Sequence, residues 1–230
     1  MKELFGNTLF FGFALSVGTY ILGTKIKKRF NLFIFNPLLL SITLTITTLL
    51  VTGIDYSSYY SGAQYLSYLL TPATVALAIP LYEQTRLLKQ NFTAIMTGIT
   101  AGVATSLFTI FIMALLFKLN HTEYVTLLPK SITTAIGIGL STELEGYVSI
   151  TVTSIIITGL FGNIAGDVMC RIFRIKNPVA KGVAIGTATH VMGTSKAMEI
   201  GKIEGAMSSL SVAVAGAMTV GAAILFKNLI

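Results

Sequence analysis

The sequence predicts an all-α protein that crosses a membrane several times. Of its 230 residues, 53% are hydrophobic and only 11% are charged, whereas a soluble domain carries about 25% charged residues. Apolar stretches of about 17–25 residues, the length that a helix needs to cross a hydrocarbon core of ~30 Å, recur along the whole chain. No polar stretch is long enough to form a soluble domain. We therefore expect a single integral membrane domain over residues 1–230.

Five segments have the uniform apolar composition of ordinary membrane-spanning helices. The first lacks a basic leader and an A-x-A-like cleavage site, and its exit flank TKIKKRF (24–30) is typical of a stop-transfer signal. We therefore interpret it as a span rather than a signal peptide. The five predicted spans are residues 7–24, 33–53, 91–117, 147–170 and 204–226.

Three further segments carry proline or glycine together with hydroxyl side chains near their middle. They are residues 63–82, 125–142 and 180–199. In lipid, such interruptions free backbone polar groups, which must be satisfied by protein or by a water-filled cavity. We expect these segments to be broken or re-entrant helices.

The interrupted segments also resemble one another. LLTPATVALAIPL (69–81) aligns with LLPKSITTAIGIGL (127–140), and GTATHVMG (186–193) resembles TPATVALA (71–78) more weakly. Interrupted helices in corresponding positions of repeated units are typical of the substrate site of a transporter. The alternative is a chance match between apolar stretches of low complexity.

The net charge of +7 predicts membrane orientation rather than binding to nucleic acid. The basic flank 24–30 would lie in the cytoplasm, with the N-terminus outside. The loop 54–62 has no Lys or Arg and would lie outside, with Tyr56, Tyr59 and Tyr60 as an interfacial aromatic belt. Simple alternation of crossings would then place the basic stretch 171–181 outside, against the positive-inside rule. We therefore expect 125–142 to return to the outside face and 180–199 to return to the cytoplasm.

Two lysines lie inside the interrupted segments, and both are candidates for binding an anion. A lysine at membrane depth costs about 2.5–3.5 kcal/mol and normally faces a cavity or a counter-charge. A cation, hydroxyls and free backbone N–H groups at the start of a half-helix suit a carboxylate. The alternative is that each lysine extends to the lipid headgroups. Lys130 has Ser131, Thr133 and Thr134 beside it, and Lys196 has Thr187, Thr189, Thr194 and Ser195.

His190 is the candidate for a substrate-facing or proton-coupled group, because imidazole titrates near the working pH. The alternative is a hydrogen-bonded core histidine. The second histidine, His121, falls in a predicted outside loop, so a two-histidine metal site is not expected. The one cysteine, Cys170, excludes an intrachain disulfide and a multi-cysteine metal site. We expect no cofactor.

The acidic residues favour structural roles. Glu143, Glu145 and Glu199 follow interrupted segments and could carry a coupled proton, but we favour salt bridges to lysines such as Lys196. Asp167 shares a helical face with Asn163 and lies four residues before Arg171, which predicts an intrahelical ion pair. No G-x-S-x-G, Walker loop or H-E-x-x-H motif is present. We therefore do not expect an enzyme.

Gly162 and Gly166 predict a face for close helix packing. We expect a homodimer, or a larger homo-oligomer, with this face as one candidate interface. The alternative is that both glycines pack within one protomer.

Several blocks together resemble the CidB/LrgB family over essentially the whole chain. They are the Asn36–Pro37 pair, TPATVALAIPLY (71–82), LLPKSITTAIGI (127–138) and AKGVAIGTATHVMGTSKAMEIG (180–201). The KSIT form of the middle block and the ELEG that follows it are closer to the CidB branch. The family's Thr-rich and His-containing blocks correspond here to Pro72, Thr74, Lys130, Ser131, Thr133, Thr134, Thr187, His190, Gly193 and Thr194.

This resemblance implies two functions. Bacterial members are described as holin-like or antiholin-like proteins of the cell membrane that modulate murein hydrolase activity and lysis, usually beside a small CidA/LrgA-type partner. Plant relatives translocate glycolate and glycerate, and bacterial members are linked to pyruvate. We therefore expect a transporter of a small monocarboxylate, with or without a coupled proton. The alternatives are a holin-like pore or lysis regulator that acts through oligomerisation, and a scaffold for the smaller partner.

Overall fold

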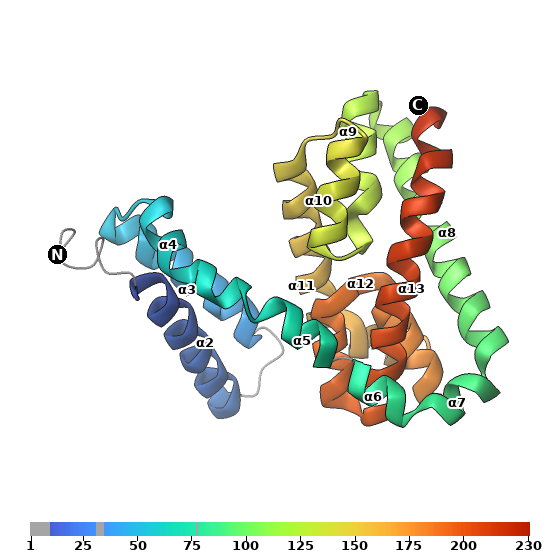
Figure 1. Cartoon of the computed structure of the whole chain (residues 1–230), viewed down its shortest axis with the longest axis horizontal. Helices are drawn as coiled ribbons and strands as arrows, with labels where there is room; N and C mark the ends of the chain where they lie inside the picture. Colours follow the sequence, from blue (N-terminus) through green and yellow to red (C-terminus); the bar gives the residue numbers. More distant parts are fainter. Residues whose placement is uncertain (1–9, 31–34, 77) are drawn as a thin grey trace. The chain divides into compact units, whose positions relative to one another are not determined.

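The computed structural model describes residues 10–30, 35–76 and 78–230, and all the regular structure in these residues is helical (Figure 1). The expected all-α class is therefore confirmed. The chain divides into two compact units, Met1–Ala76 and Leu77–Ile230. The expectation of a single domain over the whole chain stays a prediction.

The described residues of the first unit form the helices α2 (Phe11–Phe30), α3 (Pro37–Thr52), α4 (Tyr56–Ser67) and α5 (Leu70–Ala76). Helix α3 begins where the Asn36 side chain accepts the backbone N–H groups of Leu38 and Leu39, and it ends at Gly53, whose φ of 61° is left-handed. Hydroxyls join α2 to α3, because Thr19 Oγ1 lies 3.0 Å from Ser41 Oγ. These contacts position the first two predicted spans side by side.

Two predicted loops of this unit are helical. Residues 24–30 form the last turns of α2 instead of a loop, because Lys27, Lys28 and Arg29 interact favourably with the carbonyl end of the helix. Residues 56–62 belong to α4, which begins after the extended residue Asp55. In α4 the predicted tyrosine belt becomes one helical face, and the Tyr56 and Tyr60 rings stack with centroids 5.8 Å apart.

The second unit holds the remaining helices. In chain order they are α6 (Ala78–Glu83), α7 (Thr85–Gln90), α8 (Phe92–Phe117), α9 (His121–Leu127), the 3-10 turn η1 (Leu128–Ser131), α10 (Thr134–Glu143), α11 (Val148–Ile172), α12 (Pro178–Ile200), α13 (Lys202–Phe226) and η2 (Lys227–Leu229). Among the described residues, three helices are long and apolar enough to cross a membrane: Phe92–Phe117, Val148–Ile172 and Lys202–Leu229. They match three of the predicted spans to within a few residues.

The core of this unit lies along one face of α8. Ile95, Ile99, Val103, Leu107 and Ile110 recur every three or four residues and are almost fully buried. They pack with residues of η1, α10, α12 and α13 in one hydrophobic cluster. The opposite face of α8 keeps large exposed apolar side chains, as a helix in contact with lipid does.

The segment 125–142 is a broken hairpin, as the sequence predicts. Helix α9, which leads into it, lies beside the C-terminal end of α13, because the Tyr124 hydroxyl donates to Phe226 O at 3.1 Å. The end of the segment lies beside the start of α11, because Ser141 Oγ is 2.7 Å from Thr151 Oγ1. The same start of α11 returns to α9, since Thr151 Oγ1 donates to Thr126 O. The hairpin therefore leaves and returns to one end of the unit, with η1 at its tip.

The segment 180–199 forms a second hairpin within α12. Both of its arms run beside the first turns of α13. Gly186 in the first arm packs on the Ser208 backbone, and Thr194 in the second arm bonds Ser208 Oγ at 2.8 Å. The chain reverses direction between the two arms, at His190. This hairpin returns to the N-terminal end of α13, opposite the end that α9 contacts (Figure 1). The two hairpins therefore enter the unit from opposite ends.

Candidate functional site

A cavity of about 450 Å³ lies where the two hairpins meet against α8. Its walls come from three elements: Gly98, Gly102, Thr105, Ser106 and Thr109 of α8, Lys130 and Ser131 of η1, and Val183, Ala184, Thr187 and Ala188 of α12. The α8 residues occupy the middle of a helix that runs from Phe92 to Phe117. If α8 crosses the bilayer, the cavity lies at about half its depth.

Lys130 supplies the positive charge of the cavity. Its Nζ donates to Ser131 Oγ at 3.1 Å, and Ser131 Oγ lies 3.1 Å from Ser106 Oγ. Among the described residues, no carboxylate lies within ion-pair distance of Lys130. An ammonium group carries three donor hydrogens, so two remain after the bond to Ser131. In the pair formed by Ser131 and Ser106, one hydroxyl donates to the other, so the second O–H has no acceptor within the pair. This end of the cavity is therefore cationic and rich in donors.

The cavity is polar at one end and apolar at the other. A Cβ added at Gly98 would lie 3.3 Å from Val183 Cγ1, and one added at Gly102 would lie 2.6 Å from Thr187 Cγ2. Ser106, one turn further along α8, bonds Ser131. Each step of four residues advances about 6 Å along the helix. Thr187 therefore lies between the cationic end and the apolar end.

Three of the predicted site residues share this cavity: Lys130, Ser131 and Thr187. Thr133 and Thr134 begin α10 and do not line it. Pro72 is exposed in α5 of the first unit, and the side chain of Thr74 lies outside the described residues. The remaining predicted residues hold or follow the bend of α12: Thr189, His190, Gly193, Thr194 and Lys196.

The bend of α12 lies at His190 and not at the glycines that the sequence suggested. His190 has φ 46° and ψ −146°, a conformation that is rare for a residue with a side chain. Its Nε2 lies 3.0 Å from Ile155 O of α11, and only 3% of the residue is exposed. Thr194 Oγ1 donates to His190 O, and Asn163 Nδ2 donates to Met192 O. His190 is thus a hydrogen-bonded core residue outside the cavity lining.

Gly186 and Gly193 are helical, and their role is close packing rather than turning. A Cβ at Gly186 would collide with the Ser208 carbonyl, and one at Gly193 would collide with Thr189 Oγ1. Thr189 Oγ1 itself donates to Ile185 O. The chain therefore does not turn at these glycines, and neighbouring elements already fill the space beside them.

Two ion pairs and one glycine contact bear on the remaining sequence predictions. Asp167 and Arg171 form the expected ion pair at 2.6 Å. Lys196 pairs with Glu199 at 2.8 Å, as the salt-bridge interpretation requires, and it does not reach the cavity. Gly162 packs against Thr189 of the same chain. The alternative for the Gly162–Gly166 face, packing within one protomer, therefore holds, and this face is not free for a dimer.

The sequence interpretation missed the α8 wall of the cavity. Gly98, Gly102 and Ser106 are four residues apart and share one helical face. The stretch was interpreted as an ordinary span because its apolar character dominates. The small residue at every fourth position, ending in a hydroxyl, is the signal that could have identified this wall.

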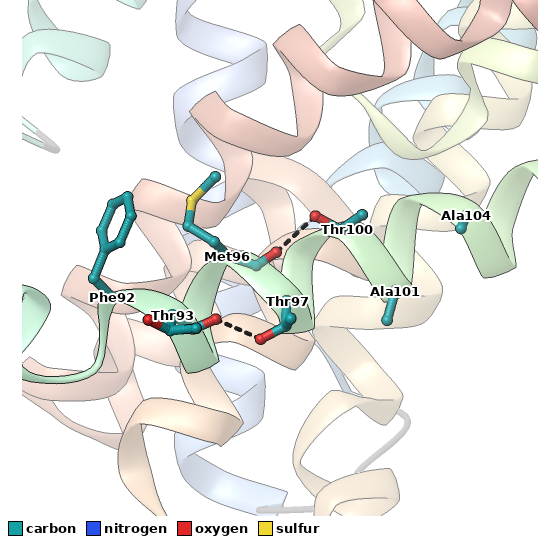
Figure 2. Close-up of a pocket in the computed structure, with 7 residues that line it drawn as sticks. All are labelled: Phe92, Thr93, Met96, Thr97, Thr100, Ala101 and Ala104. Atoms are coloured by element: carbon teal, nitrogen blue, oxygen red, sulfur yellow. Dashed lines mark hydrogen bonds between the residues drawn. The ribbon is translucent and has the colours of Figure 1, made fainter.

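A second hollow lies along α8 alone, and Figure 2 shows its lining. Two of its three threonine hydroxyls already have partners: Thr100 Oγ1 donates to Met96 O at 2.8 Å, and Thr97 Oγ1 donates to Thr93 O. No charged side chain lines it. The chemistry of this hollow therefore does not point to an anion.

The sequence is similar to proteins of one known family. A model of the LrgB-like family matches residues 16–229. The antiholin-like protein LrgB of Bacillus subtilis (strain 168) is 35% identical over 222 residues, which cover 96% of each chain. The protein of the same name from Bacillus cereus (strain B4264) is 36% identical over 214 residues, 93% of each chain. No solved structure matches. The assignment to the CidB branch stays a prediction.

Proposed function

The chain belongs to the LrgB-like family of membrane proteins, and from this premise we propose that it carries a small monocarboxylate across the membrane. The substrate would bind in the cavity between the two hairpins. The observation that carries the proposal is the position of Lys130. Its ammonium group lies beside the hydroxyls of Ser131 and Ser106, near the middle of α8, and no carboxylate pairs with it among the described residues. A membrane-embedded cation normally has a partner, and a substrate carboxylate would supply it.

The geometry also supports transport more than a simple pore. The two hairpins enter from opposite ends of the second unit, and the tip of the first meets the first arm of the second at the cavity. Broken helices that meet at a central site are typical of secondary transporters, in which the two sides open alternately. A pore that acts through oligomerisation alone requires neither a lysine nor a donor-lined cavity at this depth.

The second candidate function is regulation of lysis. The matching relatives are named antiholin-like, and the family resemblance links them to murein hydrolase control beside a small membrane partner. In this view the chain acts through assembly in the cell membrane, as a homodimer or with that partner. Native mass spectrometry in mild detergent measures the assembly, and a monomer in both detergent and bilayers would contradict the oligomer.

Uptake into proteoliposomes tests the transport proposal. Purified protein is reconstituted, and uptake of labelled pyruvate, glycolate and lactate is measured for the wild type, Lys130→Met and Lys196→Met. Losing one charge-assisted hydrogen bond costs about 1.5–3 kcal/mol, so Lys130→Met should lower affinity by roughly 10- to 150-fold. Lys196→Met is the matched control, because Lys196 pairs with Glu199 away from the cavity.

Two results would separate the candidates. Transport is contradicted if the wild type takes up none of the three acids, or if Lys130→Met takes them up as well as the wild type does. The lysis regulator is favoured instead if the wild type alters murein hydrolase activity in cells while transporting nothing. Uptake measured with and without an inward pH gradient tests the proposed proton coupling.

A further inference from the structure

The hydroxyl of Thr187 is an exception among the threonines of its surroundings. Thr100, Thr109, Thr189 and Thr194 each donate their hydroxyl to a carbonyl one turn earlier in the same helix. Thr187 does not, although α12 is helical on both sides of it. Its Oγ1 is buried and has no hydrogen-bond partner, and it is the one such side-chain atom among the described residues.

The position of Thr187 explains what its hydroxyl could bind. The residue is 7% exposed and lines the cavity that holds Lys130. Its methyl group occupies the space that Gly102 leaves on α8, because a Cβ at Gly102 would lie 2.6 Å from Thr187 Cγ2. A rotation of about 120° about the Cα–Cβ bond brings the hydroxyl to the position of the methyl group and moves the methyl group to the third staggered position. That step would present Oγ1 to a ligand in the cavity.

The spacing along α8 sets the distance between the two polar positions. Ser106 marks the cationic end through its contact with Ser131, and Gly102 marks the level of Thr187. These levels differ by about 6 Å along the helix. A short acid whose carboxylate binds Lys130 can bridge this distance with a second oxygen and a hydrogen bond of about 2.8 Å at each end.

We propose that Thr187 is a specificity-determining residue, which selects acids that carry a hydroxyl or oxo group in addition to the carboxylate. This inference rests on the proposed transport function and deepens it. A site whose buried polar group needs the substrate oxygen rejects an analogue that lacks this oxygen, because the group then stays unpaired. A cavity that recognises the carboxylate alone would not make this distinction.

The test compares pairs of acids that differ by one oxygen. Lactate is measured against propionate, and glycolate against acetate, by uptake into proteoliposomes and by thermal stabilisation of the purified protein. The variants are Thr187→Val, which keeps the shape and removes the hydroxyl, and Thr187→Ser, which keeps the hydroxyl. Thr100→Val is the matched control, because Thr100 lies on α8 outside the lining of this cavity and its hydroxyl already donates to Met96 O at 2.8 Å.

We expect the wild type to favour the oxygenated acid of each pair by roughly 5- to 30-fold. Thr187→Val should bring this ratio close to one, whereas Thr187→Ser and Thr100→Val should retain it. The inference is overturned if the wild type shows no preference, or if Thr187→Val keeps the wild-type ratio. If Thr187→Val does not fold, the wild-type ratio and a Thr187→Ala variant decide the question. If the wild type neither binds nor transports any of the four acids, the proposed function fails as well. This outcome needs no variant and is therefore distinct from a failure of the Thr187 inference.

Discussion

Substitution of Gly186 by alanine should destabilise the second unit, because this glycine lets α12 and α13 approach each other closely. An added Cβ would collide with the Ser208 carbonyl oxygen and lie 2.8 Å from Ser208 Cα. Both atoms belong to the backbone, so a side-chain rotation cannot relieve the contact. The two helices would have to move apart, which would also disturb the bond from Thr194 to Ser208 Oγ.

The magnitude follows from two opposing effects. Alanine stabilises a helix interior by about 1 kcal/mol relative to glycine, and overpacking of a well-packed contact costs about 1–3 kcal/mol, occasionally more. With the added Cβ so close to the backbone of α13, we take the upper part of this range. Gly186→Ala should therefore lower the free energy of unfolding by roughly 1–2 kcal/mol.

Gly221→Ala is the matched control. Gly221 lies in α13, and no heavy atom is within 4 Å of its added Cβ. The same substitution should therefore stabilise the protein by about 0.5–1 kcal/mol. Both variants are compared with the wild type by reversible unfolding in mixed detergent micelles. If Gly186→Ala is as stable as the wild type, or if both variants shift stability in the same direction, the close-packing explanation is refuted.

Three further predictions concern α11 and the bend of α12, and the same unfolding assay measures each of them. His190→Gly should be more stable than His190→Ala by about 1–3 kcal/mol, because glycine alone relieves the strain at φ 46°; equal stability of the two variants would contradict a strained bend. Asn163→Leu should cost about 0.5–1.5 kcal/mol, because Met192 O loses the bond from Nδ2 but still accepts from Ser195 Oγ, and a neutral effect would contradict this role. Asp167→Asn should change stability by less than about 1 kcal/mol, because its arginine partner is mostly exposed; a larger loss would show that the pair is structural.

The helical layout could be predicted from the sequence because its signals are local. Long apolar stretches identify the three longest apolar helices, and their predicted bounds differ from the observed ones by a few residues. The two hairpins were predicted from the charge rule, which constrains where each segment returns. The end of the first span is predicted less accurately, at residue 24, since helix α2 continues through charged residues to Phe30.

The bend of α12 could not be located from the sequence, because contacts far apart in the chain determine it. A glycine is the usual residue where φ must be positive, so Gly186 and Gly193 were the natural candidates. The bend lies instead at His190. Its ring is hydrogen-bonded to Ile155 O, and its carbonyl accepts a hydrogen bond from Thr194. Neither contact can be predicted from the residues next to His190 in the sequence. The glycines, in turn, are needed by neighbouring helices that the sequence does not reveal.

The polar residues of GTATHVMGTSKAME (186–199) now divide into two groups with different roles. Most of them satisfy the backbone and side chains around the bend: Thr194 bonds His190 O and Ser208, and Ser195 Oγ donates to Met192 O. A break in a helix at membrane depth requires such partners, because lipid offers none. Thr187 is the exception, since its hydroxyl serves no backbone group and its side chain lines the cavity. The density of polar residues therefore indicates where the helix bends, whereas the one buried hydroxyl without a partner among the described residues lines the cavity that we propose as the ligand site.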